Sequence, residues 1–137
     1  MSVFKNIFKS TSENKSEDVS KVKINWIPLK AVTQLNEIKE ISNAETILIF
    51  KHSTRCGISR MVLKQFEKQF DASLSHLKVY YLDLLNYRDI SSDIAATFQV
   101  MHQSPQLLVV QNGKVVAHAS HDAITSVDLK EYTAFSY

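Results

Sequence analysis

The chain has 137 residues, of which 45% are hydrophobic, so it fits one folded domain on the usual expectation of roughly 100–200 residues per domain. The 16 basic and 14 acidic residues leave a formal charge of +2, and no segment concentrates the basic ones, which argues against nucleic acid as a partner. No apolar run approaches the roughly 18–20 residues that cross a membrane, and the first ten residues lack the apolar core of a secretory signal. We therefore expect no membrane contact and a cytoplasmic location.

Two residue counts narrow the chemistry further. The chain has only 2 glycines, where an average composition of about 7% would supply roughly nine or ten, so glycine-rich phosphate-binding loops are excluded. It also has one cysteine, Cys56, so no internal disulfide can form. Any redox partner of Cys56 must be a sulfur atom on another molecule.

The chain divides into a predicted extension, residues 1–22, and a predicted folded domain, residues 23–137. Residues 9–20 contain one apolar residue in twelve, which is too few to offset the entropy of ordering them, so we expect a flexible extension. Apolar periodicity then predicts alternating elements in the domain. The predicted strands are 24–29, 46–52, 79–84, 106–111 and 114–120, and the predicted helices are 32–41, 58–70, 90–98 and 124–135.

This order of elements predicts an α/β fold. Alternation in the first half implies parallel strands with right-handed crossovers. The dipeptide Asn112-Gly113 tolerates the positive φ values of a two-residue hairpin turn, so the last two strands should be antiparallel. The expected architecture is a central mixed β-sheet flanked by helices, in a thioredoxin-like layout.

Cys56 stands between the apolar strand 46–52 and the first turn of a helix. The unpaired amide groups and the dipole at a helix start stabilise an anion, and a thiolate is such an anion. The cation of Arg55 beside it favours the same state, which is the nucleophile for sulfur exchange. The alternative is a buried structural thiol. The polar residues 52–55 before Cys56 and Gly57 after it favour the reactive interpretation.

Ser59 lies one helical turn after Cys56, in the segment Cys56-Gly57-Ile58-Ser59. A sulfur at this position would be within disulfide reach of Cys56, but a hydroxyl cannot resolve a mixed disulfide. The segment therefore predicts a one-thiol mechanism. Ser59 can at the same time cap a backbone N–H at the helix start.

Ser104-Pro105 precedes the apolar strand 106–111, and proline at such a strand entry predicts a bend, either as a cis bond or as a trans turn. In a thioredoxin-like layout this corner faces the helix of Cys56, with the backbone of Ser104 open to an extended peptide.

A zinc site could in principle be built from Cys56 and two or three histidines. The five histidines lack ligand spacing, so no metal is expected.

Together, these segments resemble the YtxJ family of monothiol bacilliredoxins. The resemblance rests on residues 50–53, 56–59, 102–106, 118–121 and 124–125 and spans about residues 26–132. It implies a thioredoxin-like enzyme that removes bacillithiol from mixed disulfides on client proteins. Cys56 would be the nucleophile, Pro105 the cis proline beside it, and Ser104 the residue whose backbone meets the substrate. The implied substrate-binding set is Arg55, Gly57, Ile58, Ser59, Ser104 and Pro105.

The resemblance also implies partners and cofactors. We expect a monomer with no tightly bound cofactor, using bacillithiol or a similar low-molecular-weight thiol as co-substrate. Two positions depart from the family pattern: Gly57 replaces a proline, and Arg55 replaces a small polar residue.

Gly57 keeps a second function open. It makes the motif similar to the C-G-F-S of monothiol glutaredoxins, which bind iron–sulfur clusters together with glutathione. Those proteins grip glutathione with a glycine-rich segment, whereas residues 119–122 here contain no glycine.

A third hypothesis is a non-enzymatic adaptor on the same scaffold. The charged segment 9–20 is the only feature of the sequence that supports it.

Overall fold

A five-stranded sheet with the order β1-β3-β2-β4-β5 runs through the domain. The computed structural model describes residues 23–133, so the predicted extension 1–22 and the last four residues lie outside the described residues. The strands are β1 (Trp26–Pro28), β2 (Ile47–His52), β3 (Lys78–Asp83), β4 (Gln106–Gln111) and β5 (Lys114–Ser120). Strands β1, β3 and β2 are parallel, while β4 pairs antiparallel with β2 and with β5. The mixed sheet predicted from the order of elements is confirmed.

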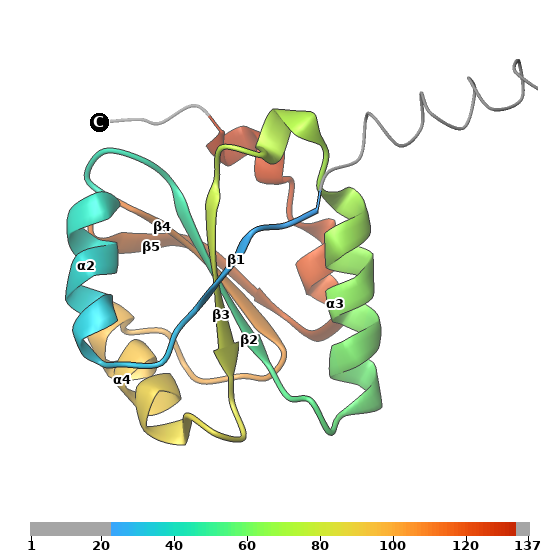
Figure 1. Ribbon diagram of the computed structural model, residues 1–137, viewed down its shortest axis with the longest axis horizontal. Helices are drawn as coiled ribbons and strands as arrows, with labels where there is room; N and C mark the ends of the chain where they lie inside the picture. Colours follow the sequence, from blue (N-terminus) through green and yellow to red (C-terminus); the bar gives the residue numbers. More distant parts are fainter. Residues whose placement is uncertain (1–22, 134–137) are drawn as a thin grey trace, which may run out of the picture.

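Helices cover the two faces of this sheet (Figure 1). Helices α2 (Thr33–Ile41) and α4 (Arg88–Phe98) pack on one face, and α3 (Gly57–Gln69) packs on the other. A short helical turn, η1 (Ala72–Leu74), which the periodicity did not predict, follows α3. Between residues 23 and 133, no helix is long and apolar enough to span a membrane.

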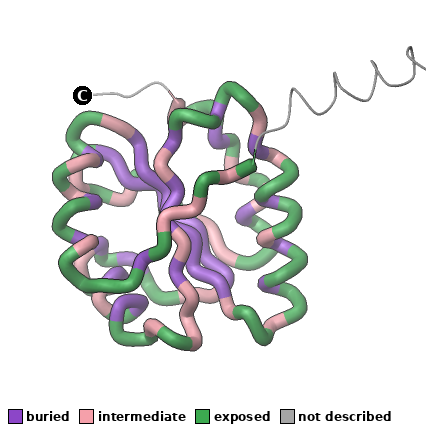
Figure 2. Tube along the Cα trace, in the orientation of Figure 1, coloured by how far each residue is buried: buried purple, intermediate pink, exposed green. Residues whose placement is uncertain are grey.

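The central strand β2 explains why two separate cores form. All six of its residues are buried, and the strand runs through the buried centre of the domain (Figure 2). Successive side chains of a strand point to opposite faces, so Ile47 and Ile49 pack toward α2 and α4, whereas Leu48 and Phe50 pack toward α3. By the same alternation Lys51 belongs to the α4 face and His52 to the α3 face. These two polar residues are therefore placed on opposite sides of the sheet just before Cys56.

The turn between β4 and β5 agrees with its prediction. Asn112 and Gly113 have φ values of 53° and 74°, the left-handed conformation that a two-residue hairpin requires. The register in which β4 pairs with β5 shifts between Val109 and Val110.

The predicted closing helix, residues 124–135, is wrong. The chain instead forms two 3₁₀ segments, η2 (His121–Ser126) and η3 (Leu129–Tyr132). Val127 and Asp128 between them are extended, and the Asp128 side chain accepts the N–H of Lys130, which starts the second segment separately. Ile124 and Leu129 still bury their side chains in the core beside α3. The apolar pattern therefore identified buried positions but not the helix type.

Candidate active site around Cys56

Cys56 is the N-cap residue of α3. Its backbone is extended, with φ −95° and ψ 121°, and its carbonyl accepts the N–H of Arg60 at 3.1 Å. Its own N–H donates to the carbonyl of Ser53 at 3.2 Å, which closes the turn between β2 and α3. No side chain caps the helix, so the amides of the first turn can stabilise an anion. The thiol is half-buried, which rules out the deeply packed structural cysteine.

The residues around this turn leave the thiol approachable. Arg55 and Gly57 are exposed, and the Ile58 side chain is 57% exposed. A Cβ atom on Gly57 would meet only the Arg60 guanidinium, at 3.9 Å, so packing does not require glycine here. Three of the predicted substrate-binding residues thus lie on the surface beside Cys56.

Ser59 is different, because it is fully buried. Its hydroxyl shares a 2.8 Å hydrogen bond with Nδ1 of His52 and accepts the N–H of Ser53 at 3.1 Å. The expected hydrogen bond from a backbone N–H to the Ser59 hydroxyl is present, and the N–H is that of Ser53, so Ser59 ties the preceding turn to α3. Burial lowers the pKa of His52, with Asp83 opposing the shift, so His52 is neutral at pH 7.

Replacing Ser59 with alanine is expected to lower the free energy of unfolding by about 1–3 kcal/mol. The change leaves the buried Nδ1 of His52 and the part-buried N–H of Ser53 without their partner. An unsatisfied buried polar group costs about 1–3 kcal/mol, whereas the part-buried N–H can turn to water. Urea denaturation measures the loss. Ser92→Ala, at an exposed position on α4, is the matched control, and equal stability of the two variants would contradict the role of Ser59.

The loop before β4 reaches the same end of the sheet as Cys56. The Ser104-Pro105 peptide bond is cis, which decides between the two predicted conformations. Gln106 pairs with Lys51 of β2, so Pro105 lies beside the last residue of the strand that leads to Cys56. The backbone of Ser104 makes no hydrogen bond within residues 23–133. The described residues therefore leave the hydrogen-bonding groups of this backbone position unused.

The side chain of Gln106 holds this loop in shape. Its amide nitrogen donates to the carbonyl of Met101 at 2.9 Å, and its amide oxygen accepts the N–H of Gln103 at 3.3 Å. The carbonyl of Pro105 accepts the N–H of His121 at 3.0 Å. Among the described residues, these contacts leave the backbones of His102 and Ser104 without a hydrogen bond in this loop.

A buried lysine contacts the same loop, and sequence reasoning missed it. Lys51 is fully buried, and its Nζ donates to the carbonyl of Ser91 at 3.4 Å and to Nδ1 of His102 at 3.3 Å. The hydroxyl of Ser91 shares a 2.9 Å hydrogen bond with the same ring nitrogen. Burial lowers the pKa of Lys51 to about 8. Burial, followed by the charges of Lys51 and Arg88, lowers the pKa of His102.

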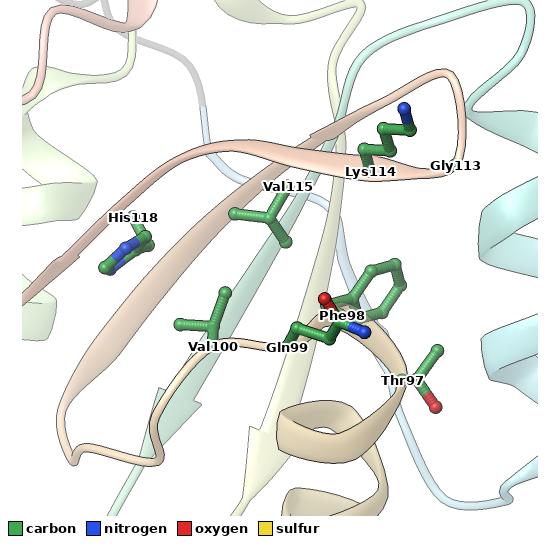
Figure 3. Close-up of a pocket in the computed structure, with 8 residues that line it drawn as sticks. All are labelled: Thr97, Phe98, Gln99, Val100, Gly113, Lys114, Val115 and His118. Atoms are coloured by element: carbon green, nitrogen blue, oxygen red, sulfur yellow. The ribbon is translucent and has the colours of Figure 1, made fainter.

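No group of three or more histidine, cysteine or acidic side chains that could hold a metal occurs in the described part of the chain. A cavity of about 530 Å³ lies between the end of α4 and the β4–β5 hairpin (Figure 3). It is at the opposite end of the sheet from Cys56, because β4 runs away from Pro105 toward this hairpin.

Comparison with known proteins agrees with this geometry. The family model for monothiol bacilliredoxin BrxC matches residues 27–129. A solved structure described as an oxidoreductase with a thioredoxin fold is 30% identical, with a TM-score of 0.65, and the match covers 78% of this chain and 92% of that one.

Two thioredoxins share the fold at lower identity. The thioredoxin of Malassezia sympodialis is 18% identical, with a TM-score of 0.63 and coverage of 85% of this chain and 96% of that one. Thioredoxin NaTrxh from Nicotiana alata is also 18% identical, with a TM-score of 0.62 and coverage of 84% and 98%. With the fold, the half-exposed single cysteine and the family match in agreement, the chain belongs to the monothiol bacilliredoxin family of thioredoxin-fold thiol–disulfide oxidoreductases.

Proposed function

We propose that this protein removes bacillithiol from mixed disulfides on client proteins, with Cys56 as the nucleophile. The observation that carries the proposal is the half-exposed Cys56 at the uncapped start of α3. Two further features support it: the open backbone of Ser104 at the same end of the sheet, and a serine, Ser59, where a second thiol would be needed for an internal disulfide.

The reaction has two exchange steps. In the first, the Cys56 thiolate attacks the bacillithiol sulfur of the mixed disulfide, so that a bond from Cys56 to bacillithiol forms and the client–bacillithiol bond breaks. The client leaves as a thiolate and takes a proton from water. In the second, a free bacillithiol thiolate attacks the bacillithiol sulfur on Cys56. Oxidised bacillithiol leaves, Cys56 returns as a thiolate, and the small thiol supplies both electrons.

Each residue of the predicted set has a place in this scheme. The unpaired backbone of Ser104 would pair with the extended segment of the client that carries the modified cysteine, and cis Pro105 shapes that loop. Arg55, Gly57 and Ile58 form the exposed surroundings of the sulfur. Ser59 is a positioning residue, because it fixes the turn before Cys56 through Ser53.

The proposal predicts a covalent adduct on Cys56. When the protein is mixed with a bacillithiolated client, mass spectrometry should show the client freed and one bacillithiol added to the peptide that contains Cys56. Added bacillithiol should then remove the adduct. Cys56→Ser should neither free the client nor gain mass.

Wild-type protein that stays unmodified while the client keeps its bacillithiol would overturn the proposal. Anaerobic reconstitution with iron and sulfide tests the alternative function. A coloured dimer with a visible absorption spectrum would support cluster binding through Cys56 of two chains, whereas a colourless protein is expected.

A further inference from the structure

A polar cavity of about 340 Å³ adjoins the turn that presents Cys56. One wall comes from the turn before α3, and the other comes from the loop between β3 and α4 at the same end of the sheet (Figure 1). Its volume lies in the range of small-molecule sites, roughly 300–1,000 Å³. It is lined by Thr54, Arg55, Leu85, Asn86 and Arg88. We call this cavity the arginine pocket.

The arginine pocket holds two positive charges and no carboxylate. Arg55 and Arg88 come from different loops, yet both line the same cavity. Neither forms a salt bridge with any residue in the range 23–133, where the ion pairs are Lys78–Glu45 and Lys130–Asp71. Two guanidinium groups that share a cavity repel each other, and an anion between them removes the repulsion. Arginine binds carboxylates through two parallel hydrogen bonds.

Further features favour an anion at this place. Arg88 is the first residue of α4, an 11-residue helix, so the positive end of the helix dipole adds to the field of the side chains. Thr54 and Asn86 add neutral polar groups that can pair with hydroxyls. The lining therefore suits a small polar molecule with carboxylates better than an apolar one.

The position of Arg55 connects the pocket to the chemistry. Arg55 directly precedes Cys56 in the turn, so a ligand held by its guanidinium can extend to the thiol. Bacillithiol has the matching layout, since its sulfur is at one end and the two carboxylates of its malate group are at the other. We propose that the arginine pocket binds the carboxylate end of the small thiol while its sulfur is exchanged at Cys56. This inference rests on the proposed function, and it identifies the pocket that selects the small thiol.

The experiment compares two modifiers on one client. The client cysteine carries either bacillithiol or 2-mercaptoethanol, which has no carboxylate, and the rate constant for release of the client is measured. For Arg55→Gln/Arg88→Gln, release from the bacillithiolated client should slow at least ~10-fold, because the charge-assisted hydrogen bonds to the carboxylates are lost. Loss of the Arg55 cation can also reduce the Cys56 thiolate, which affects both modifiers alike, so the ratio of the two rate constants (bacillithiol over 2-mercaptoethanol) is compared and should fall at least ~10-fold. Free malate should inhibit only the wild-type reaction with bacillithiol.

Arg60→Gln/Lys64→Gln is the matched control, because it removes two positive charges from α3 outside the pocket. It should keep the wild-type preference. Arg55→Lys/Arg88→Lys, which keeps the charge but loses the paired donors, should give an intermediate rate and serves if the glutamine variant does not fold.

Three outcomes would overturn the pocket while leaving the proposed function intact. The first is equal rates for wild type and the glutamine variant. The second is the same loss in the control double variant, which would indicate a general charge effect. The third is equal slowing for both modifiers, which would assign the arginines to the Cys56 thiolate or to the client protein instead of the small thiol. Failure of the proposed function is separate, since wild type itself would then leave the bacillithiolated client unchanged.

Discussion

A Ser59→Cys variant is expected to form an internal disulfide instead of retaining the small thiol on Cys56. In the wild-type protein the adduct on Cys56 can be resolved only by a second small-thiol molecule, because the residue one turn further on is a serine. A thiol at position 59 would attack Cys56 from within the same chain, releasing the small thiol and leaving a bond between residues 56 and 59. One substitution would thus replace a bimolecular step with an intramolecular one.

Helix geometry makes this bond feasible. Residues 56 and 59 are three apart at the start of α3, where a rise of 1.5 Å per residue places their Cα atoms ~5 Å apart, within the 4.4–6.8 Å that disulfides span. The new sulfur would occupy the buried site of the Ser59 hydroxyl beside His52. The loss of the hydrogen bonds to His52 and Ser53 costs stability, but a small thiol fits a buried position well.

Mass spectrometry distinguishes the two products. After reaction with a bacillithiolated client, wild type should carry the bacillithiol mass, whereas Ser59→Cys should be lighter than its reduced form by two hydrogens and carry no bacillithiol. Ser59→Ala is the matched control, since it loses the same hydrogen bonds without gaining a sulfur, and its adduct should accumulate. An adduct that persists on Cys56 of Ser59→Cys would show that the two positions do not meet.

Local patterns were enough to predict most of the fold. The apolar run that ends at His52 predicted a central strand, and β2 indeed lies between two neighbours with every residue buried. Asn112-Gly113 predicted the hairpin because only a few residue types tolerate its φ values. The final segment was mispredicted because Ile124, Val127 and Tyr132 pack into the same core at spacings of three and eight residues, which an α-helix can also satisfy. Only the extended conformation of Val127 and Asp128 separates the two possibilities.

The site was predictable where it depends on neighbours in the chain. The placement of Cys56 at a helix start and the bend at Pro105 follow from the elements that flank them, and the structure has both. The roles of Lys51 and His102 were not predictable in this way, because their contact joins β2 to a loop about fifty residues further on. The available signal was the charge itself: Lys51 interrupts a strand whose other residues, up to His52, are apolar.

The arginine pocket depends on the same kind of distant contact. Of the two arginines, only Arg55 was in the predicted substrate-binding set. Arg88 was not considered, since nothing in its local sequence distinguishes it from any helix-start residue. The parallel pairing of β2 with β3 brings the loops that follow the two strands to one end of the sheet. Loops that follow adjacent parallel strands commonly build ligand sites. That rule would have directed attention to residues 85–88 once β3 and α4 were predicted.

Replacing Lys51 with methionine is expected to stabilise the protein by about 1–3 kcal/mol at pH 7. Burial lowers the pKa of Lys51 from 10.5 to about 8, which corresponds to a penalty of about 3 kcal/mol for the charged form in the folded state. Methionine has similar length and no charge, so it removes this penalty. The expected gain in stability is smaller than this penalty because the contacts of Nζ with Ser91 and His102, at 3.4 and 3.3 Å, are lost.

The sign of the pH dependence provides a sharper test. Between pH 8 and 10.5 the unfolded chain keeps a proton on Lys51 that the folded chain has released. This group therefore raises the wild-type free energy of unfolding as the pH rises. The methionine variant lacks this gain, and its advantage over wild type should shrink across that window. Urea denaturation of both proteins at pH 7, 9 and 10.5 measures the difference, in which the other titrating groups cancel. Lys64→Met, at an exposed position on α3, should show no such pH-dependent advantage.

Lys51→Met should also slow the reaction at Cys56, although the variant keeps its fold. Without Nζ, His102 loses its 3.3 Å contact with β2, and the loop that carries Ser104 and Pro105, where we propose that the client binds, is less firmly placed. We expect adduct formation on Cys56 to slow several-fold, because misplacement of a positioning group by even ~1 Å can cost a large part of the rate. A protein that becomes more stable and less active would show that the buried lysine is retained for positioning. A Lys51→Met variant that is less stable than wild type at pH 7 would contradict this view and make Lys51 a structural residue.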